Sequence, residues 1–328
     1  MYTVQTVESL LQHLLRIPPS QWIQLFFLLA AGGIVLLHAL PRSLRDQLME
    51  YGARADNSAQ GDKATAKDDK NAIEKVLHGM IKVSRVPHSW FWHFYVLSVA
   101  TSVFWAWQIL TRGTVLKLIV ERQAALLENT AAATEADRAA NLGRLFVAWT
   151  MMFMQGSRRF YECMFVLKPG KSGMLVAHWA LGLLFYAFIG VSLWIENSAS
   201  VLDFWVTGCQ ANITSPRVAV SIAIFLYGWV NQYLCHKHLA SLQKYTLPSE
   251  GLFRYLVCPH YTCECLIYLS LAIVSAPQGK LVNVTVLTGV LFVAVNLGAT
   301  AIGTKEWSMA KFGKENVKRK WAMLPFIL

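Results

Sequence analysis

Apolar segments long enough to cross a bilayer recur along this chain and constrain its fold more than any other feature. A membrane-spanning helix needs about 20 mostly apolar residues. The sequence therefore predicts an all-α integral membrane protein with about seven transmembrane helices. The segments that qualify are residues 21–40, 90–111, 144–167, 174–195, 216–237, 252–275 and 281–302. The third and the sixth also carry charged side chains, so their hydropathy is weaker than that of the others.

The composition agrees with a membrane protein and argues against a nucleic-acid-binding one. Only 15% of the residues are charged, whereas soluble domains average about 25%. The net charge of +11 is explained by basic loops on one side of a membrane and by anionic lipid. The chain has no basic helix and no RNA-binding or zinc-finger pattern. The membrane is therefore a predicted partner, and no nucleic acid is.

The distribution of lysine and arginine predicts the orientation of the spans. The loop 41–89 holds nine of these residues and the tail 303–328 holds six, whereas the loop 196–215 holds none. Because basic loops stay in the cytosol, we expect a cytosolic C-terminus and a luminal loop 196–215. That loop also contains a glycosylation sequon at Asn212, which agrees with a luminal position.

The chain divides into two unequal parts. Residues 1–89 hold one span and a flexible cytosolic linker, whose segment 55–70 has no aromatic or large aliphatic residue. Residues 90–328 form the membrane domain, with the catalytic half at about 144–328. Residues 121–140 are rich in Ala and Glu and predict a luminal surface helix. The six cysteines imply no disulfide framework, since only Cys209 falls in a luminal loop.

Ionisable groups inside membrane spans are costly and usually functional. In the third segment, Arg158 and Arg159 lie four and three residues before Glu162, so either pair can meet on one helix face. Two interpretations stay open. The residues can form an ion pair that pins the end of the helix, or a phosphate site in which Glu162 orients a guanidinium.

Two further polar clusters occupy the fifth and sixth segments. Gln232 and His236 share a helix face, and an amide side chain inside a span needs a partner. In the sixth segment, His260 and Glu264 lie on one face together with Cys263. A zinc site is the less favoured interpretation, because no second cysteine pair exists. A polar face lining a buried cavity is the better one, and we predict no metal.

No standard nucleotide-binding or hydrolase motif is present. The sequence lacks a glycine-rich dinucleotide fingerprint, a P-loop, a nucleophile elbow and a zinc-protease motif. Any dinucleotide would therefore be held by side chains among the helices.

The polar clusters together resemble the steroid 5-alpha-reductase family, and most closely the fungal type of its polyprenal (polyprenol) reductase branch. The resemblance covers about residues 85–328, and several motifs in the same order make it specific. The matching stretches are 92–96 (WHFYV), 158–163 (RRFYEC), 245–255 with its YTLP and GLFRY, 258–268 (CPHYTCECLIY) and the closing LPFIL at 324–328.

The resemblance implies a seven-helix fold that takes NADPH from the cytosol into a cavity among the C-terminal helices. It also implies that the substrate enters from the bilayer. Arg159 falls where the family has a cofactor-contacting arginine, and Gln232 and His236 fall where the steroid branch has Asn and Asp contacts. The cofactor site predicted on this basis comprises Arg158, Arg159, Glu162, Gln232, His236, Tyr245, His260, Tyr261 and Glu264.

The chain departs from the steroid branch at the catalytic positions. Gly156 stands where that branch has the tyrosine that polarises the ketone, and Phe94 stands where it has a glutamate. The histidines and the tyrosine that the family carries near its end are replaced within 304–308 (TKEWS). We therefore expect other donors to polarise the substrate, namely His93 and Tyr95, with Gln155 behind them.

The activity that the resemblance implies is NADPH-dependent reduction of the alpha-isoprene double bond of polyprenal to dolichal. This step belongs to dolichol biosynthesis for protein N-glycosylation at the endoplasmic reticulum membrane, and its substrate is a long-chain polyprenyl lipid. The alternatives within the family are a steroid 5-alpha-reductase and a trans-2-enoyl-CoA reductase. The alternative outside enzymes is a membrane scaffold or lipid carrier, which would bind no nicotinamide.

Overall fold

The computed structural model describes residues 14–39, 84–126, 134–168, 173–208 and 210–328, together with residues 9 and 12. The predicted linker at 55–70 and Cys209 lie outside the described residues. The remaining cysteines are free thiols.

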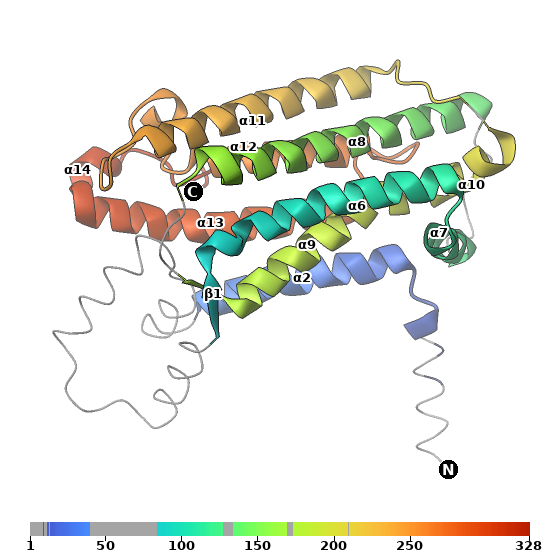
Figure 1. Cartoon of the computed structure of the whole chain (residues 1–328), viewed down its shortest axis with the longest axis horizontal. Coiled ribbons are helices and arrows are strands. Elements are labelled where there is room, and N and C mark those ends of the chain that lie inside the picture. Colours follow the sequence, from blue (N-terminus) through green and yellow to red (C-terminus); the bar gives the residue numbers. More distant parts are fainter. Residues whose placement is uncertain are drawn as a thin grey trace, which may run out of the picture.

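Long helices lie side by side along the long axis of the molecule (Figure 1). Among the described residues, five helical segments are long and apolar enough to cross a membrane. This confirms the predicted all-α membrane fold, whereas the count of seven spans stays a prediction. The five are α2 (Pro19–His38), α6 (Trp92–Thr111) with the short η2 (His88–Phe91) before it, α9 (Val176–Ile195), α11 (Pro216–Ser241) and α13 (Val284–Phe312).

Two further helices, α8 (Glu135–Tyr161) and α12 (Pro259–Val274), belong to the same bundle (Figure 1). They carry most of the charged residues that weaken the hydropathy of the third and sixth predicted spans. The outer surface of the bundle exposes large apolar side chains such as Leu29, Leu36 and Leu110. Contiguous apolar surface of this kind marks a membrane-facing protein.

Helix α8 begins and ends with recognisable local structure. Thr134 caps its first turn by accepting a hydrogen bond from the Asp137 amide, and the Asp137 carboxylate accepts one from the Thr134 amide. Its last turn widens into the π-helical η3 (Glu162–Val166). Such wide turns occur often at functional sites, and this one begins at Glu162.

The predicted luminal helix over 121–140 is wrong as a single element. Residues 121–126 end α7 (Thr114–Leu126), and residues 135–140 begin α8. The Ala- and Glu-rich composition correctly predicted helix. It did not indicate that one helix ends and another begins within this range. The capping residue Thr134 supplies the start signal for the second one.

The predicted span 252–275 begins too early. Its helix, α12, starts at Pro259, after the short η4 (Gly251–Arg254). The ring of Pro259 disfavours helical backbone at Cys258, which adopts φ −124° and ψ 63°. The Cys258 amide instead donates to the Ala322 carbonyl, and Val257 donates to Trp321. The C-terminal segment is thereby fixed against the first turn of α12.

Short elements lie at both ends of the bundle, with β1 (Arg85–Pro87) and α14 (Lys314–Val317) at one end and α10 (Ser198–Thr207) at the other (Figure 1). Strands β1 and β2 (Gly173–Leu175) pair antiparallel, with Val86 opposite Met174, and so join the start of α6 to the start of α9. The C-terminal α14 follows α13, and α10 follows α9. The main core lies between α2, α9, α12 and α13, around Phe27, Ile189 and Leu271.

Candidate active site

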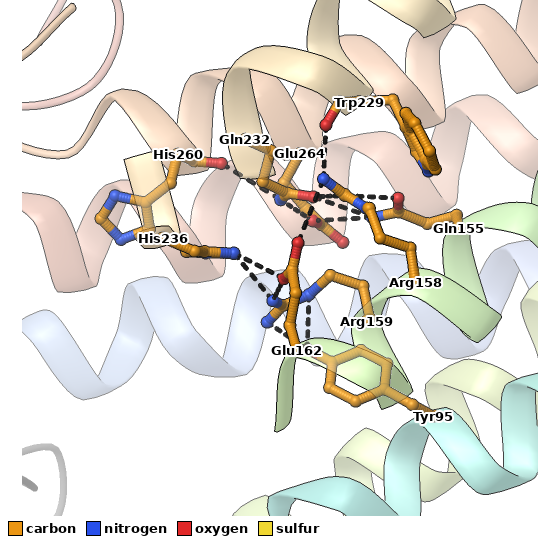
Figure 2. A network of polar contacts seen from close by, with 10 residues as sticks. All are labelled: Tyr95, Gln155, Arg158, Arg159, Glu162, Trp229, Gln232, His236, His260 and Glu264. Atoms are coloured by element: carbon orange, nitrogen blue, oxygen red, sulfur yellow. Dashed lines mark hydrogen bonds and ion pairs between the residues drawn. The ribbon is translucent and has the colours of Figure 1, made fainter. Parts of the chain in front are cut away.

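A buried ionic cluster connects three helices near one end of the bundle (Figure 2). The Arg159 guanidinium donates to Glu162 and, through Nε and Nη2, to the Tyr95 hydroxyl at 3.1 and 2.7 Å. The His236 Nδ1 lies 2.7 Å from the Glu162 carboxylate. Glu162 is completely buried, and Arg159 is 7% exposed. Residues of α6, α8 and α11 are therefore tied together around one carboxylate.

Arg158 makes a second set of contacts beside the first. Its guanidinium donates to the Trp229 carbonyl, to Gln232 Oε1 and to Gln155 Oε1, the last at 2.7 Å. It also lies 3.3 Å from Glu162 and stacks over the Trp229 ring. These protein acceptors occupy both terminal nitrogens of Arg158. The sequence left open whether Arg158 belongs to an internal ion pair or to a phosphate site. The geometry favours the internal ion pair.

Glu264 of α12 completes the network through amide side chains. Gln232 donates to the Glu264 carboxyl group and, at 3.3 Å, to the His260 carbonyl. Gln155 donates to Glu264 at 3.3 Å and to Gln232 at 3.0 Å. Two guanidinium groups are thus balanced by two carboxyl groups. A buried charge is tolerated only when it is paired and hydrogen-bonded in this way.

A cavity of about 230 Å³ opens beside this network. One part of its wall is polar and consists of Arg159, Gln232, His236, His260 and Glu264. The rest of its wall is largely apolar and aromatic, with α2, α6, α9 and α13 contributing Ile34, Phe94, Phe185, Phe292, Val293 and others. The cavity therefore combines charged groups with a hydrocarbon-like surface.

A second cavity of about 270 Å³ adjoins the first, because His260 and Tyr261 line both. Its wall includes Tyr245, Trp307 and Lys320. Tyr245 has a left-handed φ of 65°, and the ammonium groups of Lys244 and Lys311 lie 4.8 and 4.4 Å from its ring. A strained backbone held by its surroundings is typical of a ligand site.

The structure separates the residues predicted to act in catalysis. Tyr95 lines the first cavity. His93 lines neither cavity described here; its Nδ1 accepts a hydrogen bond from the Trp179 indole at 3.3 Å. Gln155 also lines neither and lies behind Gln232, where it bridges Arg158 and Glu264.

The residues predicted to bind the cofactor fall into two groups. Most of them line one or both cavities, whereas Arg158 and Glu162 line neither and contact the lining residues from behind. Those that line a cavity are Arg159, Gln232, His236, Tyr245, His260, Tyr261 and Glu264.

Several lining residues were not assigned a role from the sequence. Tyr186, Tyr268 and Asn296 line the first cavity, and Trp307 and Lys320 line the second. Tyr268 could have been predicted from the sequence, since it follows His260 and Glu264 at four-residue spacing on α12. Trp307 and Lys320 could not, because they reach the cavity only through the packing of the C-terminal segment.

Gly156 has a packing reason that excludes a tyrosine at this position. A Cβ atom built on Gly156 would lie 2.6 Å from the hydroxyl oxygen of Ser98 on α6. Helices α6 and α8 therefore approach too closely here for any larger side chain. Within the described residues, no group of three or more His, Cys, Asp or Glu side chains is arranged to hold a metal ion.

Residues 172–328 match the family described as 3-oxo-5-alpha-steroid 4-dehydrogenase. This match covers slightly less than half of the chain. Together with the relatives described below, it indicates an oxidoreductase that acts on CH–CH bonds and takes a nicotinamide cofactor. The matched region, which includes α11, α12 and α13, supplies most of the lining residues of both cavities.

Curated relatives in the family carry the name polyprenal reductase. One from Xenopus laevis is 26% identical over 258 residues, which cover 74% of this chain and 77% of the relative. The human protein is 24% identical over 256 residues, covering 74% and 78%. The Saccharomyces cerevisiae protein is 29% identical over 187 residues, covering 56% and 64%. The alignments extend beyond the C-terminal region that matches the family.

Proposed function

We propose that this protein is a polyprenal reductase, which uses NADPH to reduce the alpha-isoprene double bond of polyprenal to dolichal. The names of the relatives support this proposal. The observation that carries it is the first cavity, whose lining combines charged and aromatic side chains. An unsaturated aldehyde with a long isoprenoid tail has the same two-sided character.

The two adjoining cavities fit one extended dinucleotide. The rings of Tyr245 and Trp307, 6.4 Å apart between centroids, offer flat surfaces for the adenine. His260 and Tyr261, shared by both cavities, would lie along the middle of the cofactor. The nicotinamide would then reach Arg159, Gln232, His236 and Glu264 in the first cavity. Arg158 and Glu162 would hold these groups in place from behind.

Tyr95 is the residue best placed to polarise the substrate aldehyde. When bound, NADPH supplies a hydride to the beta carbon of the double bond. Negative charge then develops on the aldehyde oxygen. Tyr95 accepts two hydrogen bonds from Arg159, so its own hydroxyl proton is left to donate to that oxygen. A positioned donor of this kind stabilises the enolate most when its partner is a cation.

Steroid reduction in the form used by the steroid branch is disfavoured. Gly156 cannot be replaced by the missing tyrosine without displacing α6. Phe94 lines the apolar wall where that branch has a glutamate. The Tyr95–Arg159 pair would take over the polarising role from a neighbouring helix face.

The same proposal includes the orientation in the membrane. Seven spans, counting α8 and α12, would put the C-terminus and the second cavity at the cytosolic face. NADPH would then enter from the cytosol at Tyr245 and Trp307. Dolichol-linked glycosylation places the enzyme in the endoplasmic reticulum membrane.

Lys320 is expected to distinguish NADPH from NADH. Its ammonium group donates to the Pro248 carbonyl at 3.2 Å and lines the second cavity, where it can reach a 2′-phosphate. Replacing Lys320 with alanine should weaken NADPH binding roughly tenfold, the value of about one charge-assisted hydrogen bond. NADH binding should stay unchanged in the same titration calorimetry experiment.

Lys318→Ala is the matched control for this substitution, because Lys318 is exposed and pairs with Glu315. It should bind both cofactors as the wild type does. Equal losses for NADPH and NADH in Lys320→Ala would contradict a phosphate contact and would indicate a structural role for Lys320.

A substrate comparison tests the proposed activity. The purified protein with NADPH should reduce polyprenal, and it should reduce neither polyprenol nor a 3-keto-4-ene steroid at a comparable rate. The product should be identified by mass spectrometry as dolichal. Preferential reduction of the steroid, or of an enoyl thioester, would overturn the assignment.

A further inference from the structure

Tyr268 carries a buried hydroxyl group that the site described so far does not use. The residue is 1% exposed, and its side chain lines the first cavity. Its hydroxyl oxygen is excluded from water and has no hydrogen-bond partner of normal geometry. The Tyr186 hydroxyl is the neighbouring polar group that interacts with it. A buried polar group left without a good partner calls for an explanation such as a ligand or a catalytic role.

The position of Tyr268 along α12 is informative. His260, Glu264 and Tyr268 follow one another at four-residue spacing, so they share one face of the helix. All three line the first cavity. Beyond Glu264 the wall becomes aromatic, and the Tyr268 ring packs edge-on against Phe185 with centroids 5.4 Å apart. Tyr268 therefore stands where the polar wall meets the apolar one.

Tyr95 and Tyr268 differ in what surrounds their hydroxyl groups. Tyr95 is fixed by two donors from Arg159, which suits it to stabilise a negative oxygen. Within the described residues, no guanidinium donates a hydrogen bond to the Tyr268 hydroxyl. The ring of Tyr186 packs between the two, 5.7 Å from that of Tyr95.

We infer that Tyr268 is a catalytic residue that donates a proton to the alpha carbon of the substrate after hydride addition. This inference rests on the proposed polyprenal reduction. With the new C–H bond at the beta carbon formed, the substrate is an enolate with electron density at its alpha carbon. The Tyr268 O–H bond breaks, a C–H bond forms at that carbon, and the aldehyde is restored. Water then returns a proton to the phenolate, so each turnover consumes one hydride and one proton.

The substitution Tyr268→Phe tests this role without disturbing the fold. Phenylalanine keeps the ring that packs against Phe185 and removes only the hydroxyl, whose neighbouring polar group is Tyr186. The melting temperature of the purified protein should therefore stay close to that of the wild type. The turnover number should fall by about 100-fold, as expected for the loss of a general acid. NADPH affinity and the KM for polyprenal should change little.

An isotope experiment gives a readout that a structural role would not affect. The reaction is run in D2O, and the aldehyde is trapped at once with borohydride to prevent exchange. Wild type should place deuterium at one of the two prochiral positions of the alpha carbon. Tyr268→Phe should place it at both, because the released enolate is then protonated from either side.

The control is Tyr227→Phe, which removes a hydroxyl from a 54% exposed tyrosine on α11. This variant should retain both the rate and the stereospecific label. A wild type without activity on polyprenal would refute the proposed function itself. An active wild type whose Tyr268→Phe variant keeps its rate and its stereospecific label would refute only the role of Tyr268.

Discussion

Replacing Glu162 with glutamine should lower the free energy of unfolding by about 3–5 kcal/mol, the usual effect of removing one partner from a buried ion pair. Glu162 is completely buried and contacts Arg158, Arg159 and His236. Glutamine has nearly the same volume but no charge, so two guanidinium groups would remain buried with less compensation. Denaturant titration of the purified protein in detergent measures the loss.

The surface pair Glu315–Lys318 provides a matched comparison. It has the same three-residue spacing as Arg159–Glu162, but the Glu315 side chain is 77% exposed. Solvent screens such a pair, so Glu315→Gln should change the stability by less than about 1 kcal/mol. Equal effects of the two substitutions would contradict the view that the cluster around Glu162 is the buried centre that organises α8 and α11.

Replacing Tyr95 with phenylalanine should reduce the turnover number by about 100- to 1,000-fold, as is typical for loss of a donor to a developing oxyanion. NADPH affinity should be largely kept, because Gln232, His236 and the second cavity remain intact. Single-turnover kinetics with saturating NADPH would isolate the chemical step from cofactor binding.

Tyr161→Phe is the control for this substitution. Tyr161 is 50% exposed at the end of α8, close in sequence to the cluster but outside both cavities. Its loss of a hydroxyl should leave the turnover number unchanged. If Tyr95→Phe also retained normal turnover, another group would have to polarise the aldehyde, and the proposed role of the Tyr95–Arg159 pair would fail.

The architecture was largely accessible from the sequence because a bilayer demands long apolar segments. The five spans with clear hydropathy all correspond to helices that meet the length and composition required. The third and sixth segments were ambiguous because they contain charged residues, and the same residues indicate the site. Arg158, Arg159 and Glu264 lower their hydropathy, and these same residues form the buried network beside the cavity.

Helical spacing identified neighbours but could not say which of them face a cavity. Gln155 and Arg159 are one turn apart on α8, yet only Arg159 lines the first cavity. The widened turn at Glu162 is a departure from ideal helix that no spacing rule anticipates. His93 pairs with Trp179, a residue 86 positions away. That contact depends on how α6 and α9 pack.

The residues that line the second cavity were even harder to predict from the sequence. Tyr245 was found through a family motif, whereas Trp307 belongs to the region where this chain departs from the family pattern and Lys320 lies outside every matching stretch. They come together because the backbone of residues 255–258 pairs with residues 321–322. Long-range pairing of this kind brings residues together without leaving a local pattern in the sequence.

The most direct test of the proposed chemistry uses NADPH that carries deuterium at the transferable position of the nicotinamide. Purified protein and polyprenal should yield dolichal with one deuterium at the beta carbon of the terminal isoprene unit. Mass spectrometry and NMR of the product locate the label. Deuterium at the aldehyde carbon, giving polyprenol, would show carbonyl reduction instead and would contradict the account, as would an absence of transfer to polyprenal.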